Sequence, residues 1–374
     1  MGKGKISVAV IGGGAGGLCA AIAAAENGAG VTIIERNNRV GKKLLKTGNG
    51  RCNLSHEGVT PEDYNHPDFV SEVLTEWDNA ALLGFFRSLG LYTVRDAEGR
   101  CYPLSDTASS VLDVLRLRCA ALGVEERCST EVRSLGQRRG RWVLRFTEGG
   151  EAEFDRVIVS TGGGTQLLKE LGHSMIPFSP VLCPLKTELA PIRGLSGLRQ
   201  RCRVTLWRNG RAVYSESGEV LFRDYGLSGI VVLNLSRLAR KGDVLSLNLL
   251  PDWDEEQVKA MLSERKGRGS ETFTGVFHRR IGEALLRYAS EGIPLFTAVT
   301  DLRLTVEGCA DAANAQVTRG GAAVDEFDRA TMESRLHKGL YCIGEALDID
   351  GKCGGYNLHW AFASGLTAGR SCIK

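Results

Sequence analysis

The stretch Val-Ala-Val-Ile-Gly-Gly-Gly-Ala-Gly-Gly at residues 8–17 decides the fold of this chain. Four residues that favour β-strands run into a glycine cluster, and an alanine-rich helix follows from Leu18. The glycines match the pattern G-x-G-x-x-G at Gly12, Gly14 and Gly17. This order predicts a strand, a tight phosphate-binding turn and a helix.

The glycines of the turn have different roles. We expect Gly12 to permit the turn, Gly14 to let a pyrophosphate approach the backbone, and Gly17 to let helix and strand pack closely. The anion would rest on backbone N–H groups at the start of the helix, where Ala15 and Gly16 lie.

The flanking sequence supports a dinucleotide site. The helix at residues 16–27 ends before Gly28, and a strand at residues 31–35 completes a βαβ unit. Glu35 follows Gly12 by 23 residues, which is near the spacing of about 20 typical of the acid that binds a ribose hydroxyl. An adenine dinucleotide is therefore the predicted ligand.

An alternative interpretation is a signal peptide or a membrane span. Residues 6–25 carry no charge and follow Lys3 and Lys5. Five glycines in this segment disfavour a helix of either kind, and the chain continues directly into a predicted strand. We therefore favour the strand and turn.

Composition sets broad limits on the class of protein. A chain of 374 residues can form two or three domains, and 43% hydrophobic with 24% charged residues is ordinary for a globular protein. No other segment approaches membrane-spanning length, so we expect a cytoplasmic protein without membrane contact. The net charge of +3 and the lack of a basic extension give little support to a nucleic-acid partner. The oligomeric state stays open.

The cysteines predict neither a metal site nor a redox pair. The chain has eleven cysteines and no C-x-x-C motif, which removes the common zinc and thioredoxin-like patterns. We expect most of them to be buried and reduced.

A basic and glycine-rich segment follows Glu35. Six Lys and Arg residues lie at residues 36–51, and residues 47–53 read Thr-Gly-Asn-Gly-Arg-Cys-Asn. These cations could form a solvated face or neutralise phosphates. We favour phosphate binding, because Gly48 and Gly50 would also allow backbone amides to reach a ligand.

The pattern of the next hundred residues is typical of a flavin-binding dinucleotide fold. A helix with Ser105 as its N-cap precedes predicted strands at residues 130–135, 141–147 and 152–161. The last strand runs into glycines at 162–164, which we expect to return beside the first glycine turn. The predicted fold is α/β, a Rossmann-like FAD domain of the glutathione-reductase type with a β-meander.

The segment after Met175 predicts an inserted domain. Strands are expected at residues 201–208, 211–217, 218–222, 230–234 and 244–250, as a small antiparallel sheet or barrel. Helices are expected at 254–266 and, capped by Ser270, at 271–289. After 297–305 the chain should return to the first domain, with strands at 315–318 and 339–344 and a helix at 358–370.

Together these motifs resemble the HI0933-like flavoproteins, the family of BaiN-type and aminoacetone-oxidase-type enzymes, over nearly the whole chain. The matching segments are residues 12–17, 35–43, 47–53, 102–105, 160–163, 226–229, 317–321 and 344–358. The resemblance implies an FAD domain at residues 1–180 and 308–374, a β-barrel at 181–250 and a small helical domain at 251–307.

The resemblance also implies how FAD is bound. Glu35 would bind the adenosine ribose, Arg36 and Lys43 would lie near the adenosine and phosphates, Gly344 and Glu345 near the ribityl chain, and residues 354–358 beside the isoalloxazine. The full set of expected FAD-binding residues is Gly12, Gly14, Ala15, Gly16, Gly17, Glu35, Arg36, Lys43, Gly48, Asn49, Gly50, Arg51, Cys52, Asn53, Thr161, Gly162, Gly163, Gly344, Glu345, Gly354, Gly355, Tyr356, Asn357 and Leu358.

Because flavin performs the redox chemistry, the protein needs mainly to bind, orient and polarise. Reduced flavin is negative near N1 and O2, so a helix that begins at Leu358 would stabilise it with its positive end. The candidate catalytic residues are His359 and Tyr356, although a histidine on such a helix is often structural. Cys52 and Cys353 flank the expected flavin and could be redox-active.

Several functions agree with this pattern. The first is NADH- or NADPH-linked reduction of a small organic substrate, such as a conjugated enone of bile-acid or steroid type. The second is an amine or aminoketone oxidase that produces hydrogen peroxide. Modification of tRNA and a flavin-binding scaffold without turnover are less favoured.

Overall fold

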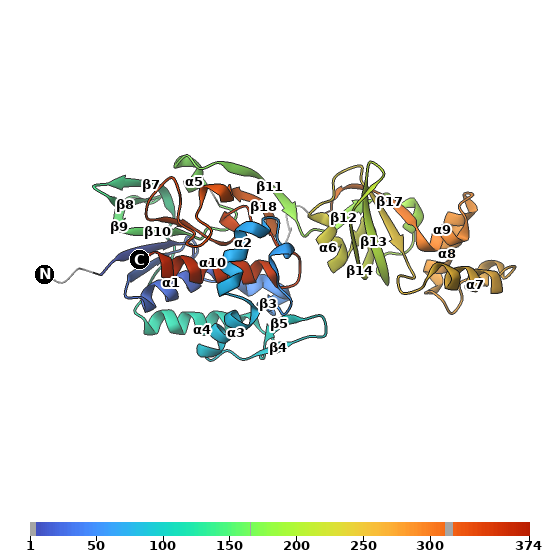
Figure 1. Cartoon of the computed structure of the whole chain (residues 1–374), viewed down its shortest axis with the longest axis horizontal. Coiled ribbons are helices and arrows are strands. Elements are labelled where there is room, and N and C mark those ends of the chain that lie inside the picture. Colours follow the sequence, from blue (N-terminus) through green and yellow to red (C-terminus); the bar gives the residue numbers. More distant parts are fainter. Residues whose placement is uncertain (1–4, 165, 311–316) are drawn as a thin grey trace. The chain divides into compact units, whose positions relative to one another are not determined.

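The computed structural model describes residues 5–164, 166–310 and 317–374. Its internal contacts divide the chain into two compact units. The first contains the described residues up to Ser179 together with Thr318–Lys374, and the second lies within Pro180–Val317 (Figure 1). The second unit is thus inserted into the chain of the first.

A five-stranded parallel sheet forms the centre of the first unit. Its strand order is β19-β10-β1-β2-β6, and each described pairing between neighbours is parallel. The strands are β1 (Ser7–Ile11), β2 (Gly30–Ile34), β6 (Glu125–Arg127), β10 (Arg156–Val159) and β19 (Leu340–Cys342). The strand order reverses at β1, which is the point where an open α/β sheet binds its ligand.

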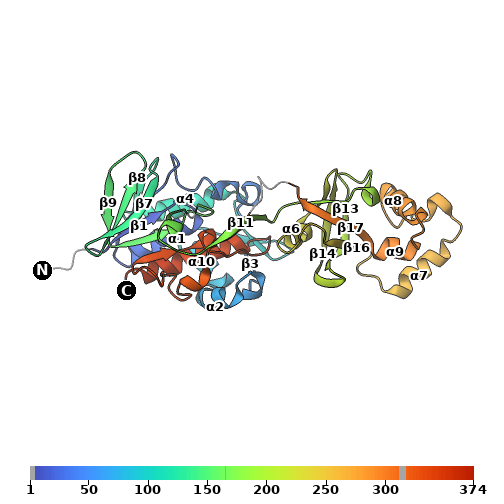
Figure 2. The same ribbon diagram turned by 90° about the horizontal axis from the view of Figure 1, so that it is seen from above.

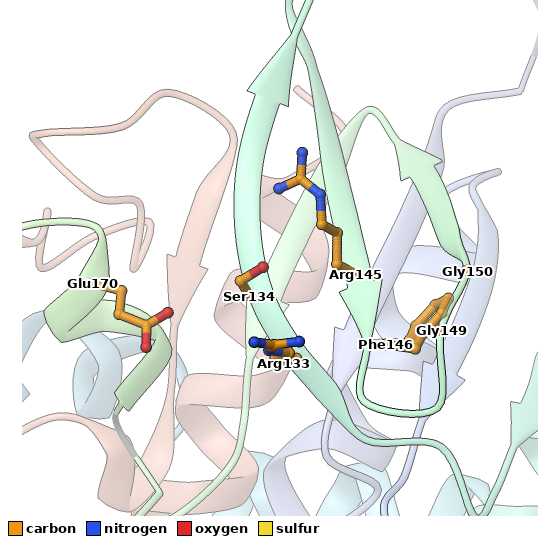
Figure 3. Close-up of a pocket in the computed structure, with 7 residues that line it drawn as sticks. All are labelled: Arg133, Ser134, Arg145, Phe146, Gly149, Gly150 and Glu170. Carbon is orange, nitrogen blue, oxygen red and sulfur yellow. The ribbon is translucent and has the colours of Figure 1, made fainter.

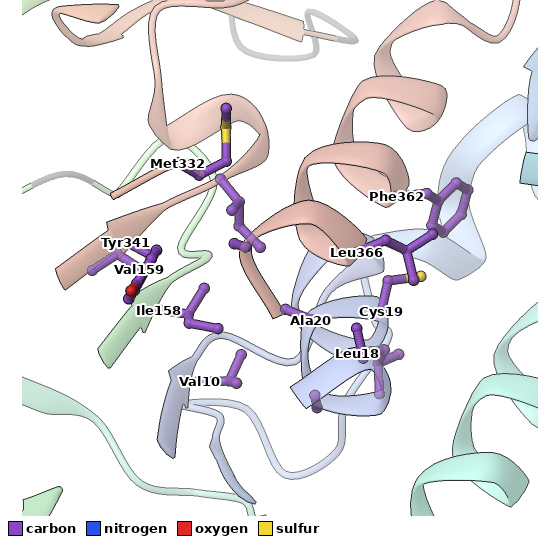
Figure 4. Close-up of a cluster of buried hydrophobic side chains, with 14 of the residues drawn as sticks. Val10, Leu18, Cys19, Ala20, Ile158, Val159, Met332, Tyr341, Phe362 and Leu366 are labelled. Atoms are coloured by element: carbon purple, nitrogen blue, oxygen red, sulfur yellow. The ribbon is translucent and has the colours of Figure 1, made fainter. Parts of the chain in front are cut away.

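Two helices from opposite ends of the sequence pack together on this sheet. They are α1 (Ala15–Glu26) and α10 (Tyr356–Ser371), which lie side by side in both views (Figures 1 and 2). Residues of both helices meet residues of β1, β10 and β19 in one apolar core (Figure 4). A Cβ on Gly365 would overlap the Gly16 carbonyl oxygen, and one on Gly369 would overlap that of Ala20. The backbones of α1 and α10 can approach this closely only because α10 has glycine at these positions.

Smaller sheets and helices complete the first unit. The sheets are the meander β7 (Val132–Arg138), β8 (Arg141–Phe146) and β9 (Glu151–Phe154); the sheet of β3 (Ser55–His56), β5 (Arg100–Pro103) and β4 (Thr93–Arg95); and the pair β11 (Met175–Val181) and β18 (Val317–Ala322). The helices are α2 (Pro67–Glu76), α3 (Asn79–Ser88), α4 (Ala108–Ala121) and α5 (Gln166–Glu170). The fold class expected from the sequence, a Rossmann-like α/β domain with a meander, is confirmed.

Two local predictions in this unit were wrong. The strand expected at residues 152–161 is two strands, β9 in the meander and β10 in the parallel sheet. Asp155 separates them, and its carboxylate accepts hydrogen bonds from the backbone N–H and the hydroxyl of Ser7, at 2.8 and 2.7 Å. The N-cap of α4 is Thr107 rather than Ser105, because the Thr107 hydroxyl accepts the N–H of Ser109.

A closed barrel forms the centre of the second unit. Its strand order is β12-β15-β14-β13-β16-β17. The strands are β12 (Leu185–Thr187), β13 (Arg199–Arg208), β14 (Arg211–Arg223), β15 (Gly226–Ser228), β16 (Val244–Asn248) and β17 (Leu302–Cys309). Its helices are α6 (Ile230–Ser236), α7 (Glu255–Glu264), α8 (Arg279–Ser290) and α9 (Leu295–Thr300). In the sequence, β17 comes after these helices, so the barrel strands come partly before and partly after the helical segment.

The strand predicted at residues 230–234 is the helix α6. Its residues 231–236 are all buried, and a short run that is apolar on every side has no period that separates a helix from a strand. The chain enters α6 through Gly229, whose φ of +104° is suited to glycine.

The helix predicted at residues 271–289 with Ser270 as its cap begins only at α8, where the His278 side chain is the cap. Gly275 interrupts the helical path with a φ of +79°. The Arg265 guanidinium also donates to the Thr274 carbonyl, at 2.9 Å, which occupies an acceptor that a continuous helix would use.

Other expectations concern single residues or short segments. Residues 315 and 316 of the predicted strand 315–318 lie outside the described residues, and β18 begins at Val317. Cys183 and Cys309 form a disulfide. Within the part of the chain that the structure describes, no helix is both long and apolar enough to cross a bilayer.

The close approach of α1 and α10 can be tested with two separate glycine-to-alanine variants. Gly365→Ala should lower the free energy of unfolding by about 1–3 kcal/mol, because the added methyl overlaps the Gly16 backbone. Gly84→Ala in α3 is the control, since its Cβ would meet no atom within 4 Å, and it should stabilise the protein by about 1 kcal/mol. Urea unfolding followed by fluorescence measures the free energy of unfolding of both variants. Equal values for Gly365→Ala and Gly84→Ala would contradict this packing.

Candidate functional site

The first glycine turn is held by the carboxylate of Glu35. Glu35 is 7% exposed, and it accepts the Gly13 N–H at 2.9 Å and the Asn37 N–H at 2.8 Å. A Cβ on Gly12 would overlap the Ser160 carbonyl, and one on Gly17 would overlap the Gly12 carbonyl. The turn therefore closes onto both the end of β10 and its own helix, and Gly17 allows the close packing of helix and strand that its spacing predicted.

Gly14 differs from its neighbours in the turn. A Cβ at this position would meet no protein atom within 4 Å. The residue also has an ordinary φ of −84°, so neither packing nor conformation requires glycine there. Space beside a backbone at the start of α1 fits a bound pyrophosphate, which needs that approach and the N–H groups of the first helical turn.

The second glycine turn lies beside charged groups from two distant segments. Lys43 forms an ion pair with Glu345, and Glu345 also accepts the Thr318 N–H at 2.9 Å. A Cβ on Gly162 would lie 3.5 Å from the Glu345 carboxylate and 4.0 Å from the Lys43 ammonium. The structure thus brings together residues that the sequence assigned separately to phosphate and ribityl binding.

The loop at residues 47–53 has an unusual backbone. Gly48, Asn49, Gly50 and Cys52 all have positive φ, from 55° to 85°, although positive φ is uncommon for non-glycine residues. Loops of this kind can turn N–H groups toward an anion. The Cys52 thiol is fully buried, and burial raises its pKa to about 12, so its thiolate is not available at neutral pH.

The start of α10 is shaped by a glycine pair. Gly354 and Gly355 have φ of +122° and +110°, and no side chain caps the helix. Asn357 braces the preceding loop, because its side-chain amide accepts the Gly351 N–H at 2.8 Å and donates to the Gly351 and Lys352 carbonyls. A Cβ on Gly355 would overlap the Ser55 carbonyl, so β3 lies directly against the positive end of this helix.

His359 lies inside the protein. It has no exposed surface, its Nδ1 lies 2.8 Å from the Ser55 hydroxyl, and its Nε2 lies 2.8 Å from the Trp77 carbonyl oxygen. Because a carbonyl can only accept, Nε2 carries the proton and Nδ1 accepts from Ser55. Burial lowers the pKa of His359 to about 4. At neutral pH the ring is uncharged and both of its nitrogens are occupied.

Tyr356 is the first residue of α10 and is buried, with 8% of its surface exposed. Its ring stacks on His56, with centroids 4.9 Å apart, and meets the Tyr64 ring edge-on. The Tyr64 hydroxyl donates to the Tyr356 carbonyl at 2.8 Å. Leu358, two residues further along α10, packs against the core of the first unit.

Several contacts near these loops were not predicted. The Arg51 guanidinium lies over the Tyr102 ring, 4.3 Å from its centroid, and donates to Asp106 at 2.6 Å. Arg319 pairs through two hydrogen bonds with Asp350, which is fully buried. The motifs at 102–105 and 317–321 were visible in the sequence, but the pairing partners of Tyr102 and Arg319 lie far away in the chain and gave no local signal.

Two residues of the predicted FAD-binding set lie apart from the contacts described above. Arg36 is exposed and forms no ion pair with a described residue, and Gly163 is exposed as well. A hollow of about 500 Å³ on the meander is lined by Arg133, Ser134, Arg145, Phe146, Gly149, Gly150 and Glu170 (Figure 3). None of these residues was predicted to bind FAD.

Residues 6–371 match the model of the HI0933-like protein Rossmann domain. The chain belongs to the HI0933-like family. It is 35% identical to a 3-dehydro-bile acid Δ4,6-reductase of Clostridium scindens, over 98% of this chain and 99% of that protein. It is also 28% identical to a ribosomal RNA dihydrouridine synthase of Escherichia coli, over 99% of this chain and 98% of that protein.

Solved structures with a similar fold are also flavoproteins. A flavocytochrome c3 fumarate reductase has a TM-score of 0.52 at 15% identity, covering 100% of this chain and 79% of its own. A 3-ketosteroid-Δ4-(5α)-dehydrogenase of Rhodococcus jostii has a TM-score of 0.50 at 14% identity, covering 100% and 98%. At these identities the likeness concerns the fold alone. Family and fold together identify the protein as an FAD-dependent oxidoreductase.

Gly14 allows ligand binding to be separated from folding. Gly14→Ala should leave the free energy of unfolding of the FAD-free protein within about 0.5 kcal/mol of wild type, because no protein atom opposes the methyl group. It should weaken FAD binding at least about tenfold, because the methyl enters the space for the pyrophosphate. Urea unfolding and quenching of flavin fluorescence measure the two effects. Unchanged FAD affinity would show that the pyrophosphate does not lie beside Gly14.

The pKa of His359 predicts a specific acid sensitivity. The folded pKa of about 4 lies below the ordinary 6.5, so the unfolded chain binds the proton more readily. The neutral His359 ring therefore contributes about 3 kcal/mol to the free energy of unfolding above pH 6.5, and this contribution is lost as the pH falls toward 4. His359→Gln keeps an amide donor and acceptor but does not titrate. Urea unfolding from pH 4 to 7.5 should show a smaller pH dependence in this variant, and an identical dependence would contradict the assignment.

Proposed function

We propose that this flavoenzyme takes hydride from NADH or NADPH and reduces a carbon–carbon double bond conjugated to a carbonyl in a small substrate of bile-acid or steroid type. The observation that carries the proposal is the 35% identity to the bile acid reductase across nearly the whole of both chains. The match extends beyond the glycine motifs that unrelated flavoproteins share. It therefore bears on the substrate as well as on the cofactor.

The residues brought together in the first unit fit FAD. The turn at Gly12, Gly14 and Gly17 would hold the pyrophosphate, Glu35 the adenosine ribose, and Lys43 with Glu345 the phosphates and the ribityl chain. Bound FAD supplies the hydride chemistry of the reaction. The chain itself binds and orients the cofactor and sets its electrostatic surroundings.

The positive end of α10 supports the reductive direction. Its first turn follows the left-handed Gly355 and has no side-chain cap, so the N–H groups can face a ligand. A negative charge placed there gains about 0.3–2 kcal/mol from the helix dipole. Reduction places negative charge on the pyrimidine side of the flavin ring, and this helix end would stabilise it.

The contacts of the two candidate catalytic residues suggest different roles. His359 is buried with both ring nitrogens occupied, so we assign it a positioning role, in which it joins α10 to Ser55 and to the Trp77 carbonyl. Tyr356 lies at the helix start beside the glycine pair and stays the candidate for contact with the reacting groups.

A second candidate is the reduction of uridine in ribosomal RNA. It is favoured by the 28% and 26% identities to ribosomal RNA dihydrouridine synthases of Escherichia coli and Haemophilus influenzae. Both kinds of relative are named for saturating a double bond that is conjugated to a carbonyl. The two candidates thus share a reaction class and differ in the size and charge of the substrate.

Anaerobic spectroscopy tests the proposal. NADH or NADPH should bleach the visible absorbance of bound flavin, because each transfers a hydride to it. A 3-oxo-Δ4 steroid should then restore the absorbance, because its conjugated double bond accepts the hydride. The matched control is the saturated 3-oxo steroid, which should restore nothing.

The alternatives give different results in the same experiment. Restoration by uridine-containing ribosomal RNA, but not by the enone, would replace the first candidate with the second. A flavin that neither nicotinamide bleaches, but that an amine or aminoketone reduces with release of peroxide in air, would contradict both candidates and favour the oxidase.

A further inference from the structure

Asn53 carries a buried acceptor that the protein leaves unsatisfied. Its side chain is 8% exposed, and its Oδ1 is buried without a hydrogen-bond partner among the described residues. Buried polar atoms are almost always paired, because the hydrogen bonds to water lost on burial must be replaced. An unpaired oxygen beside a predicted cofactor loop therefore calls for a donor from the ligand.

The oxygen lies next to the start of α10. It is 2.8 Å from the position that a Cβ on Gly355 would occupy, so only glycine leaves room for it there. Asn53 follows Cys52, whose left-handed φ of +58° turns the chain at this point. The adjacent β3 is fixed by the hydrogen bond from the Leu54 N–H to the Cys101 carbonyl, at 2.8 Å. The position of Asn53 is thus set by the backbone on both sides.

The two features together form a complementary pair. The first turn of α10 presents N–H donors, and Asn53 presents an acceptor beside them. The pyrimidine ring of a flavin has the opposite arrangement along one edge, with acceptors at N1 and O2 and the donor N3–H next to them. Neither feature alone would distinguish this edge from another polar group.

We propose that Asn53 Oδ1 accepts a hydrogen bond from the N3–H of FAD while the start of α10 faces O2 and N1. The assignment rests on the proposed FAD site and is independent of the substrate. A neutral amide suits this place better than a carboxylate, since it supplies an acceptor without repelling negative charge at N1 and O2. Asn53 and Gly355 would then recognise the ring in a fixed orientation.

Binding of FAD and of 3-methyl-FAD, which lacks the N3 proton, tests this assignment. Wild type should bind FAD about tenfold more tightly than the analogue, as expected for one buried hydrogen bond. Asn53→Leu has similar bulk and no acceptor, so its ratio of dissociation constants should fall to about one. Asn53→Asp keeps an acceptor, and its preference for FAD should persist. Quenching of flavin fluorescence gives all six constants.

A fold control accompanies these measurements. Thermal unfolding of FAD-free Asn53→Leu should show a midpoint no lower than that of wild type, because the substitution removes a buried acceptor that has no partner. A lower midpoint would show that the oxygen is paired in the protein and would overturn the proposal.

Other outcomes overturn it as well. A preference for FAD that persists in Asn53→Leu would show that the methyl group is excluded by size alone. Equal binding of both flavins by wild type would remove the N3 contact and leave the FAD site intact. An Asn53→Leu variant with normal affinity for oxidised FAD but a lowered reduction potential would instead place the oxygen at N5. A wild-type chain that binds neither flavin would overturn the FAD site itself.

Discussion

The first unit depends on the contact between the backbones of α1 and α10. These helices belong to opposite ends of the chain, and Gly365 and Gly369 let them approach until the carbonyls of Gly16 and Ala20 fill the space of absent side chains. Helix α1 carries the first glycine turn, and α10 begins at the glycine pair near the proposed flavin ring. One close contact therefore sets the distance between the two halves of the proposed cofactor site.

Hydrogen bonds to carboxylates fix the loops around that contact. Glu35 joins the first turn to the segment after β2, because it accepts the N–H groups of Gly13 and Asn37, and Asp348 accepts the Gly320 N–H at 3.0 Å. Burial alone would raise the pKa of the Asp348 carboxyl, but its hydrogen bonds with His66 and the Gly320 N–H lower that pKa overall. These acids hold backbone segments in place around the proposed cofactor site, where glycine N–H groups and helix ends also lie.

The sequence predicted the elements that have a local signature. The turn at Gly12, Gly14 and Gly17 was predictable because the spacing is itself a local pattern: Gly12 and Gly17 leave no room for a Cβ, and Gly14 lies beside open space. Helix α10 and the meander followed from periodicity. The helix α6 was missed because a run that is buried on all sides has no period. The late start of α8 was missed because it depends on Arg265, ten or more residues away, and on Gly275. At the site, the pairing of Lys43 with Glu345 joins residues 302 positions apart, and no local sequence pattern predicts such a pair.

The first and the last strand of the barrel in the second unit are neighbours. Strand β12 pairs with β17, and the Ala310 N–H donates to the Pro184 carbonyl at 2.8 Å. The first and last strands of the barrel are therefore joined by backbone hydrogen bonds. The barrel thus closes on itself between its first and last strands, and its six strands complete one another without a strand from the first unit.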